Sequence, residues 1–376
     1  MKKILKKMVL WIAASIGLLI LTGILFISFS PQFGKPPSSE LQKSYQDFDN
    51  FEDGKFTNQS ETKMEISYVK MLKDWMKKAP HRAPQKTIQV EKIDSLTIEK
   101  RADSITQLTW FGHSTFLLEI DGKNILLDPM MGDSPSPIPA LGASRYSDEL
   151  PIQIEQLPFV DAVILSHDHY DHLDYGSIQK LKNKVGRFFT PTGVGSHLIA
   201  WGVAKEKITE LNWWQTAALD SIQLVCTPAR HFSGRGLFDR SATLWASWVI
   251  TGTKENIFFS GDSGYDNHFK TIGEKYGPFD LSMLECGQYN LQWKSIHMLP
   301  EETAQAGIEL KSTLTMPIHW GAFTLAMHDW MEPVQRMKLK AAELNLPVTT
   351  PKIGEALVLG KETFPIQKWW EEYINE

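Results

Sequence analysis

The chain has 376 residues, with 39 basic and 44 acidic side chains, a formal net charge of −5, 42% hydrophobic residues and two cysteines. This length and composition can supply the core of one large or two ordinary domains, which excludes disorder over most of the chain. Two cysteines exclude a disulfide scaffold. The chain beyond the first 34 residues contains 35 basic and 44 acidic side chains, which gives it a net charge of −9. This negative charge argues against nucleic acid as a partner.

The N-terminal segment is predicted to be a membrane anchor. No charged residue occurs from Met8 to Phe29, and an apolar run of this length can cross a bilayer as a helix. A cleaved signal peptide is the alternative, because Ser28 and Ser30 imitate its cleavage site, but the run is too long and Pro31 follows directly. Four lysines before the run predict a single-pass protein with a cytoplasmic N-terminus and an extracytoplasmic body.

Composition divides the chain into three parts, which are the anchor (1–34), a linker with an N-terminal extension (35–104) and the main domain (105–376). The extension contains one amphipathic pattern, which predicts a helix over Met64–Lys77. We expect the extension to pack on the main domain. The apolar side of its helix consists of Met64, Tyr68, Met71, Leu72 and Trp75.

The third part alternates short apolar runs with helical segments. Asp121-Gly122 between the runs Ser114–Ile120 and Asn124–Leu127 predicts a hairpin. Asp174 is a helix N-cap for a segment ending near Leu181, and Pro300 opens a helix to about Lys311. Together these signals predict mixed sheets covered by helices. Further strands are predicted at Ala162–Ser166, Ile222–Thr227, Trp245–Thr251, Asn256–Ser260, Leu281–Leu284 and Leu314–Ile318.

Directly after the run Ala162–Ser166 comes an H-x-H-x-D-H pattern, from His167 to His172. Burying so many polar groups without partners is costly, and a bound metal removes that cost. A lone histidine is usually structural, but this spacing predicts metal binding, with nitrogen and oxygen ligands that suit zinc and also iron or manganese. No thiolate joins the pattern. Cys226 and Cys286 are expected to be buried free thiols, with a disulfide between them as the alternative.

This pattern and its surroundings resemble the metallo-β-lactamase superfamily, and within it the branch of N-acyl-phosphatidylethanolamine-hydrolysing phospholipases D. The most branch-specific match is the sequence MPIHWGAF near the C-terminal end of the resemblance. The matching segments occur in the expected order. They are Trp110–Gly122, Ile125–Pro129, Asp161–Asp174, Thr227–Phe232, Leu244–Trp248, Phe258–Tyr265, Gly277–Leu281 and Met316–Phe323.

The resemblance implies an α/β fold, a four-layer αββα sandwich with two divalent metal ions, most readily zinc, at one edge. Three of the implied ligands also make sense from the residues alone, because each follows a predicted strand at a turn. The implied ligands are His167, His169 and His231 for the first ion, Asp171, His172 and His319 for the second, and Asp262 as the bridge between them.

Four residues of the implied site, one of them a ligand, have further roles. Asp171 would also accept a proton from the metal-activated water, and His297 would contact the phosphate or assist the leaving group. Asp128 is a candidate to orient a ligand imidazole, with an ordinary Asp-Pro turn as the alternative. His113 is placed near the site by resemblance, with a structural histidine as the alternative.

The resemblance favours a phosphodiesterase of phospholipase D type that acts on N-acylphosphatidylethanolamine-like phospholipids by attack of metal-bound hydroxide. The implied bridging carboxylate shifts the choice toward phosphodiester, thioester or lactone hydrolysis. The chain has Ile296 where the branch tends to have glutamine, which leaves the head group open. Two alternatives remain: a lactonase like the sugar-phosphate lactonases of the same fold, and a non-catalytic metal-binding module. The sequence leaves the oligomeric state open.

Overall fold

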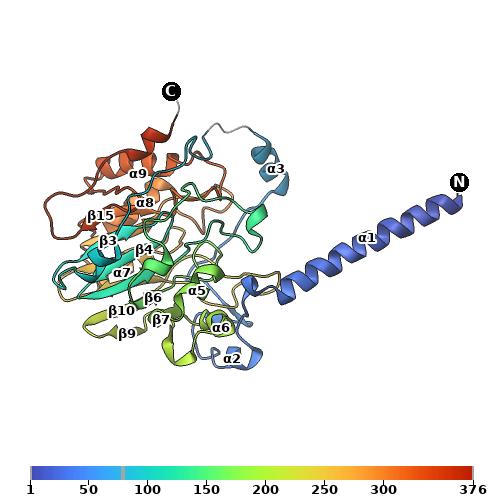
Figure 1. Ribbon diagram of the computed structural model, residues 1–376, viewed down its shortest axis with the longest axis horizontal. Helices are drawn as coiled ribbons and strands as arrows, with labels where there is room; N and C mark the ends of the chain where they lie inside the picture. The colour runs from blue at the N-terminus through green and yellow to red at the C-terminus, as the bar shows by residue number, and fades with distance from the viewer. Residues whose placement is uncertain (1, 78–80, 375–376) are drawn as a thin grey trace.

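Two β-sheets stacked face to face form the centre of the protein (Figure 1). The computed structural model describes residues 2–77 and 81–374. In spatial order the first sheet contains β15 (Ala356–Val358), β3 (Gln107–Trp110), β4 (Phe116–Ile120), β5 (Lys123–Leu127), β6 (Val160–Ile164), β7 (Val185–Pro191) and β8 (Ile208–Leu211). The second contains β14 (Thr315–Ile318), β13 (Leu281–Glu285), β12 (Asn256–Phe259), β11 (Ser247–Thr251), β10 (Ile222–Thr227) and β9 (Thr216–Leu219).

Large apolar side chains fill the space between the sheets. Successive side chains of a strand point to opposite faces, so each strand contributes alternate residues to this layer. Leu118 and Ile164 enter it from the first sheet, and Trp248 and Phe259 enter it from the second, all fully buried. Cys226 lies in the same layer and is a free thiol, as is the buried Cys286, so the expectation of free thiols is confirmed.

Helices cover the outer face of each sheet and complete four layers. Ile178 and Leu198 of the first helical layer, and Phe269 and Leu310 of the second, are buried against the strands. The predicted αββα sandwich is therefore confirmed. The first layer contains α4 (Ser95–Glu99), α5 (Tyr175–Leu181) and α6 (Gly195–Ala200), and the second contains α7 (His268–Lys275), α8 (Pro300–Glu309) and α9 (Glu332–Glu343).

Strand direction brings the polar residues of interest to one edge of the sandwich. Strand β5 is parallel to β6, and β12, β13 and β14 are mutually parallel neighbours. The carboxyl ends of parallel strands meet at the same edge of a sheet. Residues that directly follow these strands in the sequence therefore converge on that edge.

The N-terminal extension packs on the body as expected, except at its amphipathic helix. It contains α2 (Ser39–Lys43), β1 (Phe51–Glu52) and β2 (Lys55–Phe56), and it buries Tyr45 and Phe56 in the core between the sheets. Helix α3 (Tyr68–Met76) begins later than predicted, because the preceding residues are extended and bond to residues 292–295. Four of its described apolar side chains do not pack on the body: Tyr68, Val69, Leu72 and Met76 are 80%, 65%, 57% and 64% exposed. The side chain of Trp75 lies outside the described residues.

Helix α1 (Lys2–Phe29) projects away from the body (Figure 1). None of its residues is buried, and within the described part of the chain it alone is long and apolar enough to cross a membrane. The backbone directly after it is bonded to the body, with the Trp201 indole donating to the carbonyl of Pro31 at 2.7 Å.

The layer between the sheets predicts a large cost for truncating Phe259. The Phe259→Ala substitution should lower the free energy of unfolding by roughly 3–5 kcal/mol, because it leaves a cavity in a closed core. Denaturant unfolding of the detergent-solubilised chain measures this. The matched control is Phe238→Ala, at a side chain that is 97% exposed, which should change stability by less than about 0.5 kcal/mol. Equal effects of the two substitutions would contradict this placement of the core.

Candidate metal centre

The H-x-H-x-D-H segment lies in the loop that leaves β6 at the carboxyl edge of the first sheet. The amides of His172 and Leu173 both bond to the carbonyl of His169, and this turn brings Asp171 and His172 back toward His167. The second sheet supplies His231 after β10, Asp262 after β12 and the remaining ligand candidate, His319, directly after β14. All seven predicted ligands are thus brought to one edge.

One group of ligand atoms consists of His167, His169, His231 and Asp262, whose donor atoms all lie within 4.8 Å of one another. His169 Nδ1 is 2.9 Å from His167 Nε2 and 3.2 Å from His231 Nε2. The carboxylate oxygen Oδ2 of Asp262 is 3.8 Å from the Nε2 atoms of His167 and His231. Three imidazole nitrogens and one carboxylate oxygen are a ligand set typical of zinc and its neighbours.

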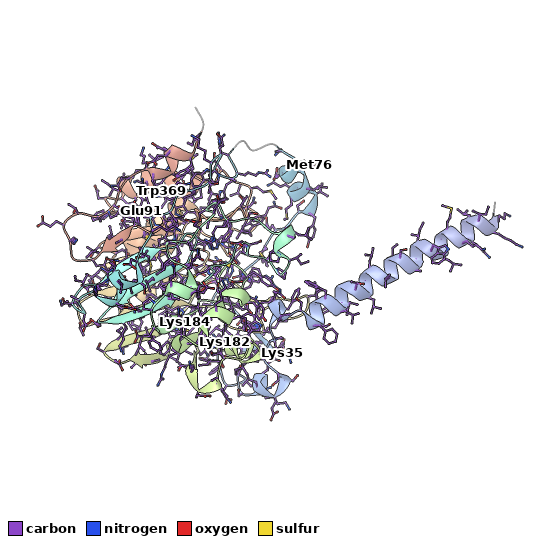
Figure 2. The ribbon with its side chains drawn as sticks, viewed as in Figure 1. Lys35, Met76, Glu91, Lys182, Lys184 and Trp369 are labelled. Carbon is purple, nitrogen blue, oxygen red and sulfur yellow. The ribbon has the colours of Figure 1, made fainter. Side chains whose placement is uncertain are left out.

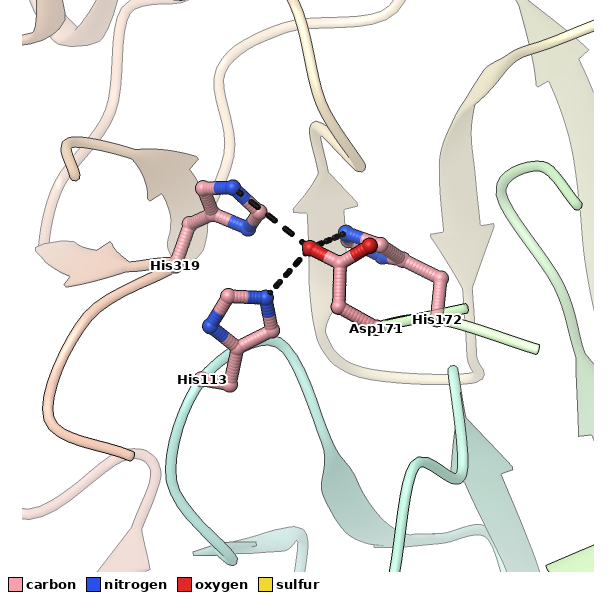
Figure 3. A group of neighbouring side chains, drawn as sticks. All are labelled: His113, Asp171, His172 and His319. Carbon is pink, nitrogen blue, oxygen red and sulfur yellow. Dashed lines mark hydrogen bonds and ion pairs between the residues drawn. The ribbon is translucent and has the colours of Figure 1, made fainter. Parts of the chain in front are cut away.

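A second group lies beside the first and consists of His113, Asp171, His172 and His319 (Figure 3). Its three imidazoles converge on Asp171 Oδ2, with Nε2 of His113 at 2.9 Å, of His172 at 3.5 Å and of His319 at 3.9 Å. His113 therefore lies in the site rather than serving only the fold. It was predicted near the site, and the structure gives it the position of a ligand candidate.

Asp262 connects the two groups. Its Oδ1 lies 3.1 Å from His172 Nε2 and 3.0 Å from His319 Nδ1, while its Oδ2 faces the first group. The backbone turn that carries it requires glycine at 261, where φ is +54°. A Cβ there would lie 2.5 Å from the Ser166 Cβ, so the turn can approach the β6 end only without a side chain.

In two of the ligand imidazoles, the Nδ1 atom is hydrogen-bonded to a buried carboxylate or to a backbone carbonyl. Asp128 accepts from His172 Nδ1 at 2.7 Å and from the Ser166 amide at 2.7 Å, an arrangement that suits the predicted role of orienting His172. The Nδ1 of His231 donates to the carbonyl of Ile296 at 2.9 Å. In both rings this leaves Nε2 directed at the cluster.

Burial sets the charge of most of these imidazoles. It holds the pKa of His167, His231 and His319 well below the usual range, and lowers that of His169 to about 4 and that of His113 to about 4. The rings are therefore neutral at pH 7. A neutral imidazole with a free lone pair is the form that binds a metal.

The buried carboxylates of the site would be stabilised by bound cations. Burial alone would lower the pKa of His172, but Asp262, Asp171 and Asp128 raise it well above its usual value. Burial raises the pKa of Asp262 to about 7. His172 Nε2 and Asp262 Oδ1 are buried 3.1 Å apart, and the geometry gives neither atom a regular hydrogen bond among the described residues. Divalent cations between these groups would balance the buried carboxylates, and the donor set fits them.

His297 faces the same cluster from the loop before α8. Its ring is stacked on His319 with centroids 5.4 Å apart, and its Nδ1 is paired with the buried carboxylate of Glu285. Sequence reasoning predicted His297 but missed Glu285. The available signal was its position at the end of an apolar strand, the same signal that identified Asp262. Ser114, whose Oγ is 3.2 Å from His319 Nδ1, had no such signal.

A cavity of about 310 Å³ opens over both groups. Its floor includes Asp171 and Asp262, and its wall includes the guanidinium group of Arg240, which lies 3.8 Å from the centre of the Phe232 ring. The remaining wall is mainly apolar. It contains Met64, Ile66, Trp293, Ile296 and Leu325.

Three comparisons with known proteins identify the same family and fold. The sequence profile of the Beta-lactamase superfamily domain matches residues 123–320. An uncharacterized protein of Mycobacterium tuberculosis is 41% identical over 85% of this chain and 87% of its own length. N-acyl-phosphatidylethanolamine-hydrolyzing phospholipase D 1 of Caenorhabditis elegans is 34% identical over 61% of this chain and 68% of its own. The structure of Igni18, a metallo hydrolase from Ignicoccus hospitalis, has the same fold, with a TM-score of 0.52 and 22% identity over 69% of this chain and 100% of its own.

The contact between Asp128 and His172 predicts a specific effect on metal affinity. Asp128→Asn should weaken binding of the metal that His172 contacts by roughly 10- to 100-fold, because an amide is a poorer acceptor for the Nδ1 proton. Chelator competition on the purified full-length chain measures the affinity. The control is Asp220→Asn, at a carboxylate 71% exposed and paired with Lys123, which should leave metal affinity unchanged. Unaltered affinity in Asp128→Asn would contradict the orienting role.

Proposed function

The chain belongs to the metallo-β-lactamase superfamily, in the branch related to N-acyl-phosphatidylethanolamine-hydrolysing phospholipases D, and on that premise we propose that it is a membrane-anchored phosphodiesterase with two metal ions. Metal-dependent hydrolysis follows from the family itself. The two ions, zinc as the metal and a phospholipid as the substrate belong to the proposal, as does the division into an anchor (1–34), an extension (35–104) and a catalytic domain (105–376).

The position of Asp262 is the observation that carries the proposal. Its two oxygens face different groups. Apart from Asp262 and His113, each group offers three nitrogen or oxygen ligands. A carboxylate shared in this way supports a pair of neighbouring cations. Two such ions, when bound, would lower the pKa of a water between them and polarise the phosphodiester oxygens.

Asp171 is suited to remove a proton from the attacking water. Burial would raise its pKa, but His172 and His113 outweigh burial and hold that pKa well below the usual range, so the group is a carboxylate at neutral pH. Asp171 lines the cavity, and its Oδ2 is held by the 2.9 Å contact with His113. That contact fixes the acceptor within reach of a water over the ligand cluster.

His297 is suited to give a proton to the leaving alkoxide. The buried Glu285 holds its Nδ1, which leaves Nε2 on the cavity side of the ring. Burial lowers the pKa of His297 and raises that of Glu285 well above its usual range, so the pair can share a proton on the Nδ1 side while Nε2 carries the proton that the leaving group takes. Glu285 would then be a positioning residue that acts through His297.

The cavity supports a phosphodiester with apolar neighbours. Arg240 can neutralise the negative charge of a phosphodiester, and no lysine joins it among the described lining residues. A volume of about 310 Å³ is at the lower end for ligand pockets, so a lipid would place its phosphodiester there and leave its acyl chains outside. The C. elegans phospholipase D supports N-acylphosphatidylethanolamine-like lipids as the class to test first.

The proposed location follows from α1. We place this helix across a bilayer, with its lysine-rich start in the cytoplasm and the catalytic domain on the extracytoplasmic side. The exposed apolar surface of the helix supports its burial in lipid.

Replacing the bridging carboxylate tests the proposal directly. The full-length chain should carry two equivalents of metal and release phosphatidate from N-acylphosphatidylethanolamine. Asp262→Asn should lose at least about 100-fold in kcat and retain less metal, because both ligand groups lose a charged donor. Elemental analysis and mass spectrometry of products measure the two effects, with Asp220→Asn as the unchanged control. Opening of a lactone panel without diester cleavage would overturn the substrate class, and metal retention without any turnover would overturn the enzymatic function.

His297 should matter only when the leaving group needs a proton. His297→Gln should lower kcat on the lipid by roughly 100-fold and should scarcely change hydrolysis of an aryl phosphodiester, whose phenolate leaves unaided. Metal content should stay at the wild-type level. Equal losses on both substrates would contradict the proposed proton transfer and indicate a structural effect.

A further inference from the structure

Four apolar side chains on one face of α3 have no partner among the described residues. Tyr68, Val69, Leu72 and Met76 are 80%, 65%, 57% and 64% exposed. At 3.6 residues per turn these positions fall within roughly a third of the helix circumference. Met71 and Asp74, on another face, are half-buried against the body. The helix therefore turns a continuous apolar strip outward, which a helix lying on a protein core would not do.

Positive charge flanks this strip. Lys70, Lys73 and Lys77 are exposed, and Asp74 is the only acidic residue of the helix. The rest of the body is acidic. An apolar face bordered by lysines is the pattern of helices that lie in the head-group region of an anionic bilayer.

The helix starts at the mouth of the catalytic cavity. The extended residues before it are tied across the cavity rim, with the amides of Glu65 and Ser67 donating to the backbone and side-chain oxygens of Gln292 at 2.9 and 2.8 Å. Met64 and Ile66 of this stretch line the cavity. One continuous segment thus forms part of the cavity wall and then becomes α3.

The N-terminal helix fixes which side of the body faces the bilayer. Arg235 donates to the carbonyl of Gln32 at 2.6 Å and to that of Leu173, directly after the metal-binding motif, at 2.8 Å. The start of the body after α1 is therefore bonded to the catalytic loop. Figure 2 shows Lys35 near the foot of α1 and Met76 at the end of α3, both on the side of the body from which α1 projects.

We propose that α3 is an interfacial helix that inserts its apolar strip into an anionic lipid bilayer and holds the cavity mouth against it, so that a lipid enters the cavity along residues 64–67. This inference rests on the proposed phospholipid hydrolase function and on α1 as the anchor. It assigns the strip formed by Tyr68, Val69, Leu72 and Met76 to a lipid surface. A second copy of the chain and a partner protein are the occupants to be distinguished from it.

The depth of α3 in the bilayer can be measured independently of activity. The full-length chain is reconstituted into vesicles of phosphatidylcholine with phosphatidylglycerol, and a nitroxide is attached at Leu72→Cys or, as control, at Lys73→Cys. Selective labelling is possible because the native Cys226 and Cys286 are buried. We expect the label at 72 to collide mainly with oxygen and the label at 73 mainly with a water-soluble relaxer. Equal aqueous exposure of both labels, or spin–spin broadening at 72 that reports a second copy, would overturn the inference.

Lipid hydrolysis provides a second test of the role of α3. Leu72→Glu should lower hydrolysis of lipid in anionic vesicles by roughly tenfold and leave an aryl phosphodiester unchanged, because a carboxylate opposes insertion beside anionic head groups. The matched control is Leu339→Glu, at a leucine 69% exposed on α9, which should behave like the wild type. Equal lipid hydrolysis by both variants would overturn the role of α3. If the wild type cleaves neither substrate, the proposed function fails, and the label at 72 still decides whether α3 lies in the bilayer.

Discussion

The burial of Asp262 between two clusters of imidazoles is the constraint on which the rest of the site depends. Asp262 is 3% exposed, and its carboxylate oxygens approach ligand candidates of both groups. A charge in that position is tolerable only with opposite charge nearby. The six-stranded sheet brings β12 and β14 to the same edge, and the Gly261 turn lets Asp262 approach the loop after β6. The packing of the two sheets thus brings Asp262 and both groups of imidazoles together.

Much of this could be predicted because the chemistry is local in sequence or repeats at strand ends. The segment from His167 to His172 contains four of the seven predicted ligands, and His231, Asp262 and His319 each follow an apolar run. The hairpin at Asp121-Gly122 and the N-cap at Asp174 depend on neighbouring residues alone, and both are confirmed. The four layers were predicted through the family resemblance, since alternating strands and helices alone fit several mixed folds.

What could not be predicted depends on contacts between distant segments. Glu285 and His297 are twelve residues apart, and only the folding of the loop before α8 brings them together. His113 adopts a left-handed backbone with φ of +56°, held by hydrogen bonds with Trp320 and His319, and nothing in its sequence neighbourhood indicates that geometry. The exposure of α3 is a further case, because periodicity identifies an apolar face but does not identify its partner.

The loop from His167 to His172 also connects the chain that follows α1 to the ligand cluster, through the residues of the loop that are not ligand candidates. Asp168 accepts from Thr243 at 2.8 Å and from the Gly234 amide at 2.8 Å. Burial would raise its pKa, but the contact with His197 and the Gly234 bond hold that pKa below the usual range. The neighbouring Arg235 stacks on Tyr170 and bonds the backbone that follows α1. His167, His169, Asp171 and His172 are ligand candidates, and the side chains of Asp168 and Tyr170 between them connect the loop to Gly234 and Arg235. The same turn therefore places the ligand cluster against the chain that follows α1.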